Sequence, residues 1–228
     1  MNTGARANPS IARLAIGREQ APLLVIENAV PDPDALVELA ATKVYGSVEN
    51  YYPGVRARAP LSYQQFVLEK FGNVFREFFA IPGALRFTGC QFSLVTRNHA
   101  ELNELQRIPH IDSPSYHELA IVHYLFKADL GGTAFYRHRA TGFEVIDEAR
   151  RAEYFACVQR ESAGPDKPEV AYISGDTALY EQIGCQDARY NRMLVYRRNS
   201  LHSGNLGRNF VADPNPRTGR LSINAFLA

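Results

Sequence analysis

The stretch "ELAIVHYLFKADLGGTAFYRHRATG", residues 118–142, decides the fold because it joins two strand-like runs through Gly131-Gly132. Both runs are rich in apolar, aromatic and β-branched residues, which favour extended structure. A glycine pair adopts the backbone angles of a tight turn without steric cost, so the pattern predicts a β-hairpin. We expect a tight turn at Gly131-Gly132 and an inward-facing Phe135 on the second strand.

Further strand-like segments flank this predicted hairpin. "RFTGCQFSLVTR", residues 86–97, precedes it, and "MLVYRRNSLHSG", residues 193–204, and "GRLSINAFLA", residues 219–228, follow it. Between them, "DEARRAEYFACVQRESAG", residues 147–164, predicts a helix inserted into the series of strands. The C-terminal two-thirds of the chain are therefore expected to form antiparallel β-structure.

The N-terminal third predicts one strand followed by two helices. "APLLVIENAV", residues 21–30, is a short run rich in branched apolar residues, as in a buried strand. A helix follows it, with Asp32 as N-cap, Pro33 in the first turn and Gly46 as its stop. Ser62 opens a second helix, in which phenylalanines recur at near-helical spacing as a core-facing stripe: Phe66, Phe71, Phe75 and Phe78.

Length and composition narrow the class of protein. The 228 residues suit one substantial domain, so we expect residues 1–228 to form a single α+β domain. The 25 basic and 24 acidic residues nearly balance, which argues against nucleic-acid or membrane-surface binding. Three cysteines without Cys-x-x-Cys spacing indicate a reduced protein. With no secretory signal pattern and no membrane-spanning apolar run, we expect a cytoplasmic protein.

His110 and Asp112 lie two residues apart in "RIPHIDSPSY", residues 107–116. If this segment is extended, both side chains point to the same side of the chain. A divalent ion needs a further ligand, and the candidate is His202, which follows the apolar run "MLVY". Two imidazoles and one carboxylate form the facial triad of non-haem iron(II) oxygenases. No cysteine occupies these positions, which disfavours a structural zinc site.

A facial triad leaves positions open for a chelating 2-oxo acid and for dioxygen. The far carboxylate of such an acid needs a cation, and a guanidinium can bind it in a bidentate manner. Arg220 in "GRLSIN" is the candidate cation, and Ser222 on the same strand face can donate a second hydrogen bond. Tyr124 is a further candidate through its hydroxyl, with packing in the core as the alternative.

The order His-x-Asp, then His, then Arg-x-Ser in the last strand resembles the iron(II)/2-oxoglutarate-dependent oxygenases. "LGGTAFYRH", residues 130–138, resembles the Gly-Gly hairpin of their prolyl-4-hydroxylase-like branch, and "YYPGVRAR", residues 51–58, is similar to a segment of a bacterial group in this superfamily. The resemblance implies a double-stranded β-helix (jelly-roll or cupin-like) core over residues 86–228, with an insertion near residues 146–175. Residues 1–85 would then supply a strand and helices that pack on the major sheet.

The same resemblance implies a dioxygenase that uses iron(II), 2-oxoglutarate and dioxygen to hydroxylate a C–H bond of a small molecule or peptide. The site residues that it implies are the metal ligands His110, Asp112 and His202 and the cosubstrate-binding Arg220, Ser222 and Tyr124. The carboxylate of Asp112 favours hydroxylation, because halogenases leave that position open for halide. "GNLGRNFVADPNP" lengthens the connection between the distal histidine and Arg220, so Arg217 competes for the cosubstrate role.

Other histidines and arginines allow other assignments. His99 and Glu101 form a rival His-x-Glu pair, although no strand pattern surrounds them. His117 and His123 flank the apolar "ELAIV", where a lone histidine is more often hydrogen-bonded structure than a ligand. The arginines of "GVRAR" either face an anionic substrate or lie solvated in a loop: Arg56 and Arg58.

Two other functions remain open from the sequence. The first is a non-catalytic β-barrel module that binds a metal or a small ligand. The second is a cupin-type dioxygenase that does not use 2-oxoglutarate, in which a third histidine such as His123 completes the site. Formation of succinate from 2-oxoglutarate distinguishes the proposed dioxygenase from both.

Overall fold

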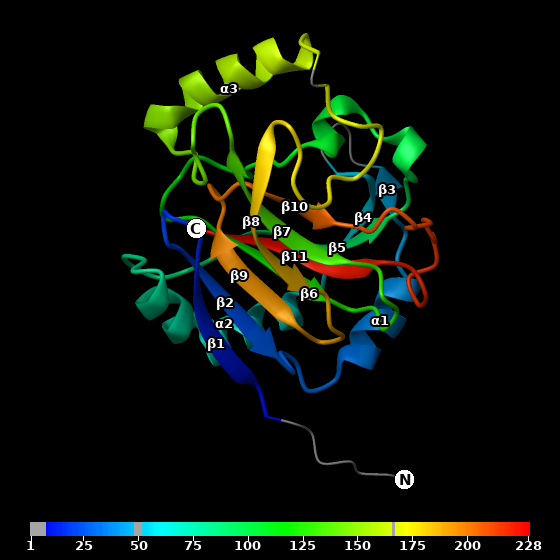
Figure 1. Ribbon diagram of the computed structural model, residues 1–228. Helices are drawn as coiled ribbons and strands as arrows, with labels where there is room; N and C mark the ends of the chain where they lie inside the picture. The colour runs from blue at the N-terminus through cyan, green and yellow to red at the C-terminus, as the bar shows by residue number, and fades with distance from the viewer. Residues whose placement is uncertain (1–7, 48–51, 166) are drawn as a thin grey trace.

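Two antiparallel β-sheets dominate the computed structural model, which describes residues 8–47, 52–165 and 167–228 (Figure 1). The larger sheet runs in the order β1 (Ser10–Ile16), β2 (Ala21–Glu27), β9 (Met193–Arg197), β6 (Leu119–Tyr124), β11 (Leu221–Leu227), β5 (Phe87–Val95), β4 (Gly54–Arg58) and β3 (Gly46–Ser47). The smaller sheet runs in the order β10 (His202–Asn205), β7 (Gly132–His138) and β8 (Tyr180–Asp187). The expected antiparallel, sheet-rich C-terminal part is therefore present.

The predicted hairpin of residues 118–142 is wrong, because its two strands lie in different sheets. β6 pairs with β9 and β11, whereas β7 pairs with β10 and β8. The glycine pair serves a close backbone approach instead of a two-residue turn. A Cβ at Gly131, whose φ is +78°, would lie 1.9 Å from the carbonyl oxygen of Asn205. The inward orientation of Phe135 is confirmed, because its side chain is buried between the sheets.

Three α-helices are present in the described ranges: α1 (Pro33–Ala41), α2 (Leu61–Phe78) and α3 (Glu148–Ser162). Two short 3-10 turns follow β5: η1 (His99–Glu101) and η2 (Glu104–Arg107). Asp32 caps α1 as predicted and accepts a hydrogen bond from the Ala35 amide, but the helix ends at Thr42, before Gly46. No helix in the described ranges is long and apolar enough to span a membrane.

The central strands of the larger sheet are buried on both faces, which explains why they are continuous apolar runs. On β2, Leu24 and Ile26 pack in the cluster that also contains Phe71 and Phe75 of α2. Leu23 and Val25, on the opposite face of β2, pack in the other cluster, which lies between the two sheets. The predicted stripe on α2 is confirmed, with two phenylalanines fully buried and two partly buried: Phe71, Phe75, Phe66 and Phe78.

The remaining helix, α3, covers the smaller sheet. It falls within the insertion expected near residues 146–175, and Asp147 caps it by accepting from the Arg150 amide. Tyr154 of α3 packs with Tyr136 and Tyr180 of the smaller sheet, and Figure 1 places α3 across the strands from α1 and α2. Residues 1–7 and Tyr51, which belong to segments interpreted above, lie outside the described residues.

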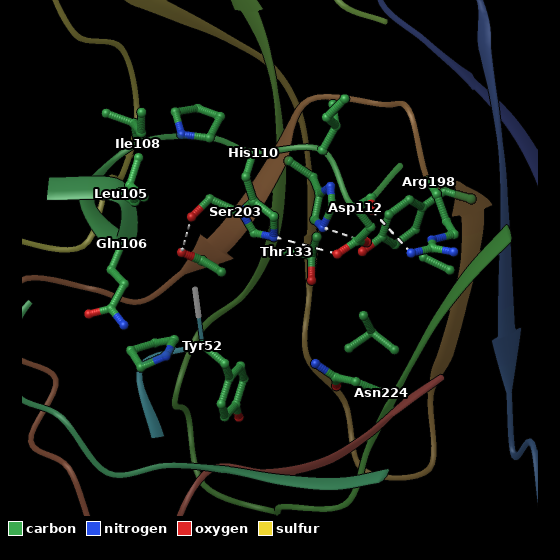
Figure 2. Close-up of a pocket in the computed structure, with 18 of the residues that line it drawn as sticks. Tyr52, Leu105, Gln106, Ile108, His110, Asp112, Thr133, Arg198, Ser203 and Asn224 are labelled. Carbon is green, nitrogen blue, oxygen red and sulfur yellow. Dashed lines mark hydrogen bonds and ion pairs between the residues drawn. The ribbon is translucent and has the colours of Figure 1, made fainter. Parts of the chain in front are cut away.

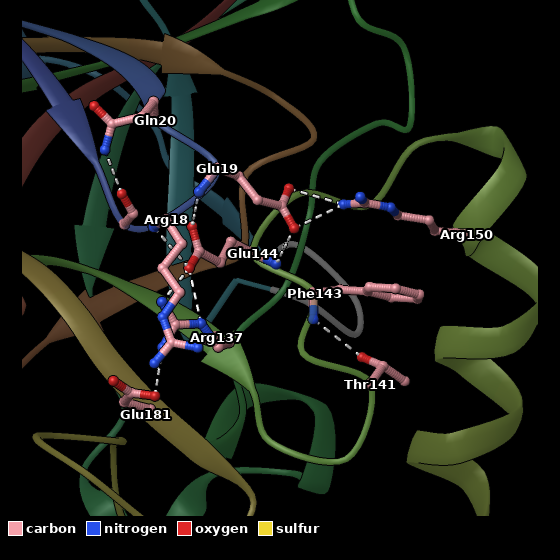
Figure 3. Close-up of polar contacts among 10 residues, drawn as sticks. Arg18, Glu19, Gln20, Arg137, Thr141, Phe143, Glu144, Arg150 and Glu181 are labelled. Carbon is pink, nitrogen blue, oxygen red and sulfur yellow. Dashed lines mark hydrogen bonds and ion pairs between the residues drawn. The ribbon is translucent and has the colours of Figure 1, made fainter.

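A buried carboxylate ties the β1–β2 turn to the end of β7 (Figure 3). Glu144 is 2% exposed and accepts hydrogen bonds from the backbone amides of Arg18 and Glu19 and from the guanidinium of Arg137. A Cβ at Gly17 would lie 2.1 Å from a Glu144 carboxylate oxygen, so only glycine fits this turn. The ion pair therefore joins the edge of the larger sheet to the smaller one.

Replacing Glu144 by Ala is expected to lower the free energy of unfolding by about 3 kcal/mol, because it leaves the buried Arg137 without this partner. Urea denaturation measures the effect. The control is Glu181→Ala, which removes the other carboxylate that pairs with Arg137. The Glu181 side chain is 36% exposed, so this substitution should lower the free energy of unfolding by less than about 1 kcal/mol. Equal losses in the two variants would contradict this assignment.

Candidate metal and cosubstrate site

A short backbone pairing brings His110 beside His202, although the two residues lie 92 positions apart in the chain. The amide of each residue donates to the carbonyl oxygen of the other, at 2.9 and 3.0 Å. This isolated bridge extends the smaller sheet beyond β10. Residues directly opposite on antiparallel chains point to the same side, and the two imidazole centroids accordingly lie 4.4 Å apart.

Asp112 completes a group of three potential ligands. Its amide donates to the carbonyl oxygen of Arg198 at 2.9 Å, which holds the segment in place after the histidine bridge. The carboxylate lies 3.6 Å from Nε2 of His202 and 3.9 Å from Nε2 of His110. Ligands about 2.0–2.2 Å from a shared ion lie somewhat closer together than this, so small side-chain rotations would form a site. The donor set suits a divalent ion.

The imidazole of His202 is oriented for ligation through Nε2, and that of His110 is neutral. Nδ1 of His202 lies 2.9 Å from the carbonyl oxygen of Ser200, which can only accept, so Nδ1 carries the proton and Nε2 of the neutral ring has a free lone pair. For His110, burial, followed by the nearby His202, lowers the pKa to about 4. His110 is therefore neutral near pH 7, as a metal ligand must be.

The three residues line a cavity of about 580 Å³. Figure 2 shows His110 and Asp112 side by side in this cavity. Arg220 lies at its wall, 6% exposed, and donates to the carbonyl oxygens of Leu130 and Gly132 at 3.0 and 2.8 Å. No carboxylate among the described residues forms an ion pair with this guanidinium. A buried cation without an acidic partner is costly, so the cavity has the electrostatic character of an anion site.

The other two predicted cosubstrate residues are placed differently. Ser222 lines the cavity, and its hydroxyl donates to the side-chain oxygen of Asn224 at 2.8 Å. Tyr124 is not among the residues that line the cavity; its fully buried hydroxyl lies 2.6 Å from that of Thr133. Thr133 does line the cavity, so it presents a hydroxyl where Tyr124 was expected to.

Arg217 does not reach the cavity. Its exposed guanidinium pairs with the exposed carboxylate of Glu38 at 2.7 Å. The longer segment between His202 and β11 thus leaves Arg220, and not Arg217, at the cavity wall.

The rival histidines have other partners. Nδ1 of His99 accepts from the Tyr172 amide, and Glu101 accepts from the Asn98 amide in a local capping box. His117 is exposed. His123 is fully buried, with its ring nitrogens 3.2 Å from the hydroxyl of Tyr63 and 3.0 Å from the side-chain oxygen of Asn191. The contact with Tyr63 shows that the His123 side chain points toward α2, and His123 is not among the residues that line the cavity. His123 therefore cannot complete the site in the way that a cupin-type enzyme would require.

The burial of His123 makes stability depend on pH. Burial lowers the pKa of His123 to about 4. An unfolded histidine binds a proton near pH 6.5, so the unfolded chain binds more protons between these values and is favoured as the pH falls. We expect His123 to contribute about 3 kcal/mol above pH 6.5 and progressively less toward pH 4. The stability gap between the wild type and His123→Gln, measured by urea denaturation, should narrow across this window.

The matched control for that series is His117→Gln, which replaces an exposed histidine and should show no such narrowing. A gap between wild type and His123→Gln that stays constant with pH would contradict the buried neutral ring.

A second group of potential ligands lies under α3: His138, Cys157 and Glu161. Nε2 of His138 lies 2.8 Å from the Glu161 carboxylate, and Nδ1 lies 2.9 Å from the hydroxyl of Thr141. These contacts use both nitrogens of the ring, so the group is explained as a buried hydrogen-bonded pair that holds α3 on β7.

Several residues of the cavity were not predicted from the sequence as site residues. Thr133 was detectable, because it lies two positions before Phe135 on β7 and therefore on the same face. Gln106 on η2 and Phe155 on α3 were not, since these elements reach the cavity only by tertiary packing. Arg56, expected either to face an anionic substrate or to lie solvated in a loop, lies on β4 and lines the cavity. Arg58, two positions along, is exposed.

Solved structures of non-haem iron and 2-oxoglutarate proteins share this fold. HygX from Streptomyces hygroscopicus with nickel and 2-oxoglutarate bound matches with a TM-score of 0.53 and 11% identity, over 94% of this chain and 87% of that chain. SnoN, described as a non-heme alpha ketoglutarate dependent epimerase from nogalamycin biosynthesis, matches with a TM-score of 0.51 and 11% identity, over 92% and 78%. At these identities the likeness is one of fold.

The chain belongs to the family described as "Family of unknown function (DUF6445)", whose model matches residues 7–227. No curated protein matches the sequence significantly.

Proposed function

We propose that this protein is an iron(II)- and 2-oxoglutarate-dependent dioxygenase that hydroxylates a C–H bond of a small-molecule or peptide substrate. The observation that carries the proposal is the convergence of His110, Asp112 and His202 in a cavity that Arg220 also lines. Arg220 is a buried cation without a carboxylate partner among the described residues. The fold shared with HygX and SnoN supports it, because the printed descriptions of those structures name 2-oxoglutarate or alpha ketoglutarate.

His110, Asp112 and His202, which line the cavity, are the residues that would hold the iron. Three protein ligands would leave further positions for 2-oxoglutarate and dioxygen. Arg220 is proposed to bind the far carboxylate of 2-oxoglutarate, and the hydroxyls of Ser222 and Thr133 line the same cavity. Ser222 would donate to the cosubstrate by turning its hydroxyl away from Asn224. When bound, iron would let dioxygen oxidise 2-oxoglutarate to succinate and carbon dioxide. One oxygen atom of dioxygen would enter succinate and the other would enter the substrate C–H bond.

The protein's own contribution is to position and exclude. The Ser200 carbonyl holds the His202 ring in the tautomer that ligates through Nε2. The wall built by η2 and α3, with apolar side chains such as Leu105 and Phe155, would exclude water from the reacting carbon. Asp112 would be the third protein ligand and would occupy the position that a halide takes in halogenases, which favours hydroxylation over halogenation.

The architecture proposed with this function is a double-stranded β-helix in which the larger and smaller sheets are the two walls of the core. We propose that residues 1–228 act as one domain. Residues 1–85 would support the larger sheet, and residues 86–228 would contain the core and the α3 insertion. Packing of α2 on the larger sheet supports this division.

The test is turnover of 2-oxoglutarate by the purified protein. With iron(II) and dioxygen we expect uncoupled formation of succinate from 2-oxoglutarate, and none when iron is removed by a chelator. Anaerobic addition of 2-oxoglutarate to the iron-loaded protein should also produce a visible charge-transfer absorption. Binding of iron and 2-oxoglutarate without any succinate would favour the non-catalytic module, and oxidation that ignores 2-oxoglutarate would favour a cupin-type enzyme.

A further inference from the structure

Arg56 is a second guanidinium in the cavity whose charge has no acidic partner. It lies on β4 opposite Ser93 of β5, half-buried, with its guanidinium carbon 4.4 Å from the ring centroid of Tyr52. In the part of the chain that the structure describes, its side chain forms no ion pair, and its buried Nε has no hydrogen-bond partner. An aromatic face stabilises a guanidinium without satisfying its N–H donors, which stay available for a ligand.

Arg56 lines the same cavity as the three potential metal ligands, His110, Asp112 and His202. Its pKa is lowered by burial, and the charges of Tyr52 and Asp112 oppose that effect. An anion bound by Arg56 would therefore lie in the same compartment as the iron.

The charges of the loaded site leave Arg56 uncompensated. Iron(II) and the cation of Arg220 are balanced by the carboxylate of Asp112 and the two carboxylates of 2-oxoglutarate. The charge of Arg56 is then in excess in a partly desolvated cavity, where an unpaired charge is unfavourable. A ligand that brings one further negative charge would restore neutrality.

We propose that Arg56 binds an oxyanion of the primary substrate, so the substrate is an acid: a carboxylate or a phosphate ester with an apolar body. This inference rests on the proposed function. The volume of about 580 Å³ falls within the roughly 300–1,000 Å³ of small-molecule sites and exceeds what 2-oxoglutarate fills. Apolar side chains in the lining of the same cavity suit such a body: Leu105, Ile108, Phe155, Val158 and Leu206.

The experiment measures binding of matched probes to the iron- and 2-oxoglutarate-loaded protein without oxygen. The probes are hexanoate, hexyl phosphate and the uncharged hexanamide. Their dissociation constants are measured by equilibrium dialysis and from the change in the visible absorption. We expect the wild type to bind at least one anion at least about tenfold more tightly than the amide, as for a charge-assisted hydrogen bond. Arg56→Gln should abolish this preference without changing hexanamide binding.

Two variants act as controls. Arg58→Gln removes an exposed arginine of the same strand and should leave all affinities unchanged, whereas Arg56→Lys should retain part of the preference for the anion. Which anion binds more tightly distinguishes a carboxylate from a phosphate substrate. The proposal is overturned if the wild type binds neither anion more tightly than the amide. It is also overturned if Arg56→Gln weakens 2-oxoglutarate as strongly as Arg220→Ala does, because Arg56 would then belong to the cosubstrate site.

The dialysis is repeated without iron and 2-oxoglutarate so that failure of the proposed function can be recognised separately. If no iron–2-oxoglutarate absorption forms, the dioxygenase assignment fails. The difference between wild type and Arg56→Gln in anion binding then tests the arginine alone, and equal binding by the two proteins overturns the proposal.

Discussion

Arg220→Ala is expected to weaken 2-oxoglutarate by tens- to thousands-fold while leaving the affinity for iron nearly unchanged. The physical reason is the loss of a charge-assisted bidentate contact, which typically costs on the order of 2–5 kcal/mol when the partner charge stays buried. Arg220 is 6% exposed, so water cannot replace the guanidinium well. The measurement is the KM for 2-oxoglutarate in the succinate assay, together with the dissociation constant from anaerobic titration.

The control has to separate cosubstrate binding from folding, because Arg220 also donates to the carbonyl oxygens of Leu130 and Gly132. Thermal unfolding of the same variants reports that structural share. Arg220→Lys should recover only part of the affinity, since an ammonium group cannot reproduce the planar fork. Arg217→Ala, which removes an exposed arginine, should leave the KM unchanged. A loss of stability in Arg220→Ala without a change in KM would give Arg220 a purely structural role.

Local signals predicted the parts of the fold whose causes are local. Asp32 and Pro33 mark the start of α1 because capping and a preset φ act within one turn. The apolar runs of β2 and β11 were recognisable because the central strands of the larger sheet are buried on both faces. Two of the strands that were not predicted, β1 and β8, lack this pattern, since most of their residues are exposed or only partly buried.

Long-range packing decided what the sequence could not indicate. Gly131-Gly132 has the composition of a hairpin turn, but the glycines are required by the carbonyl oxygens of Asn205 and Gln186, which approach from other strands. The His-x-Asp and distal histidine were recognisable as ligand types, yet their meeting depends on the backbone pairing of His110 with His202. For Tyr124, the strand pattern did not reveal that its hydroxyl is taken up by Thr133.

Replacing His202 is expected to abolish tight binding of iron at the proposed site. Removing a group that only orients a ligand typically costs 10–100-fold in metal affinity, so His202→Ala, which removes a ligand itself, should cost more than about 100-fold. Asp112→Asn should have an effect of similar size, because the amide keeps the shape of the side chain but not its negative charge. Metal analysis after dialysis against iron(II), with succinate formation as the second readout, measures both losses.

His117→Ala is the matched control, since it removes an exposed histidine five positions from Asp112 and should retain full iron content. Unfolding curves of the metal-free proteins show whether the variants fold. His202 is packed against Tyr196 and Phe135, so His202→Gln serves as a second variant that fills more of the space left by the ring. If His202→Gln and Asp112→Asn fold and still bind iron as tightly as the wild type, these side chains are not the ligands. If the wild type binds iron tightly but forms no succinate, the assignment of the metal ligands stands and the assignment as a dioxygenase fails. The two assignments separate because metal affinity depends on the three side chains, whereas turnover also requires the anion site at Arg220.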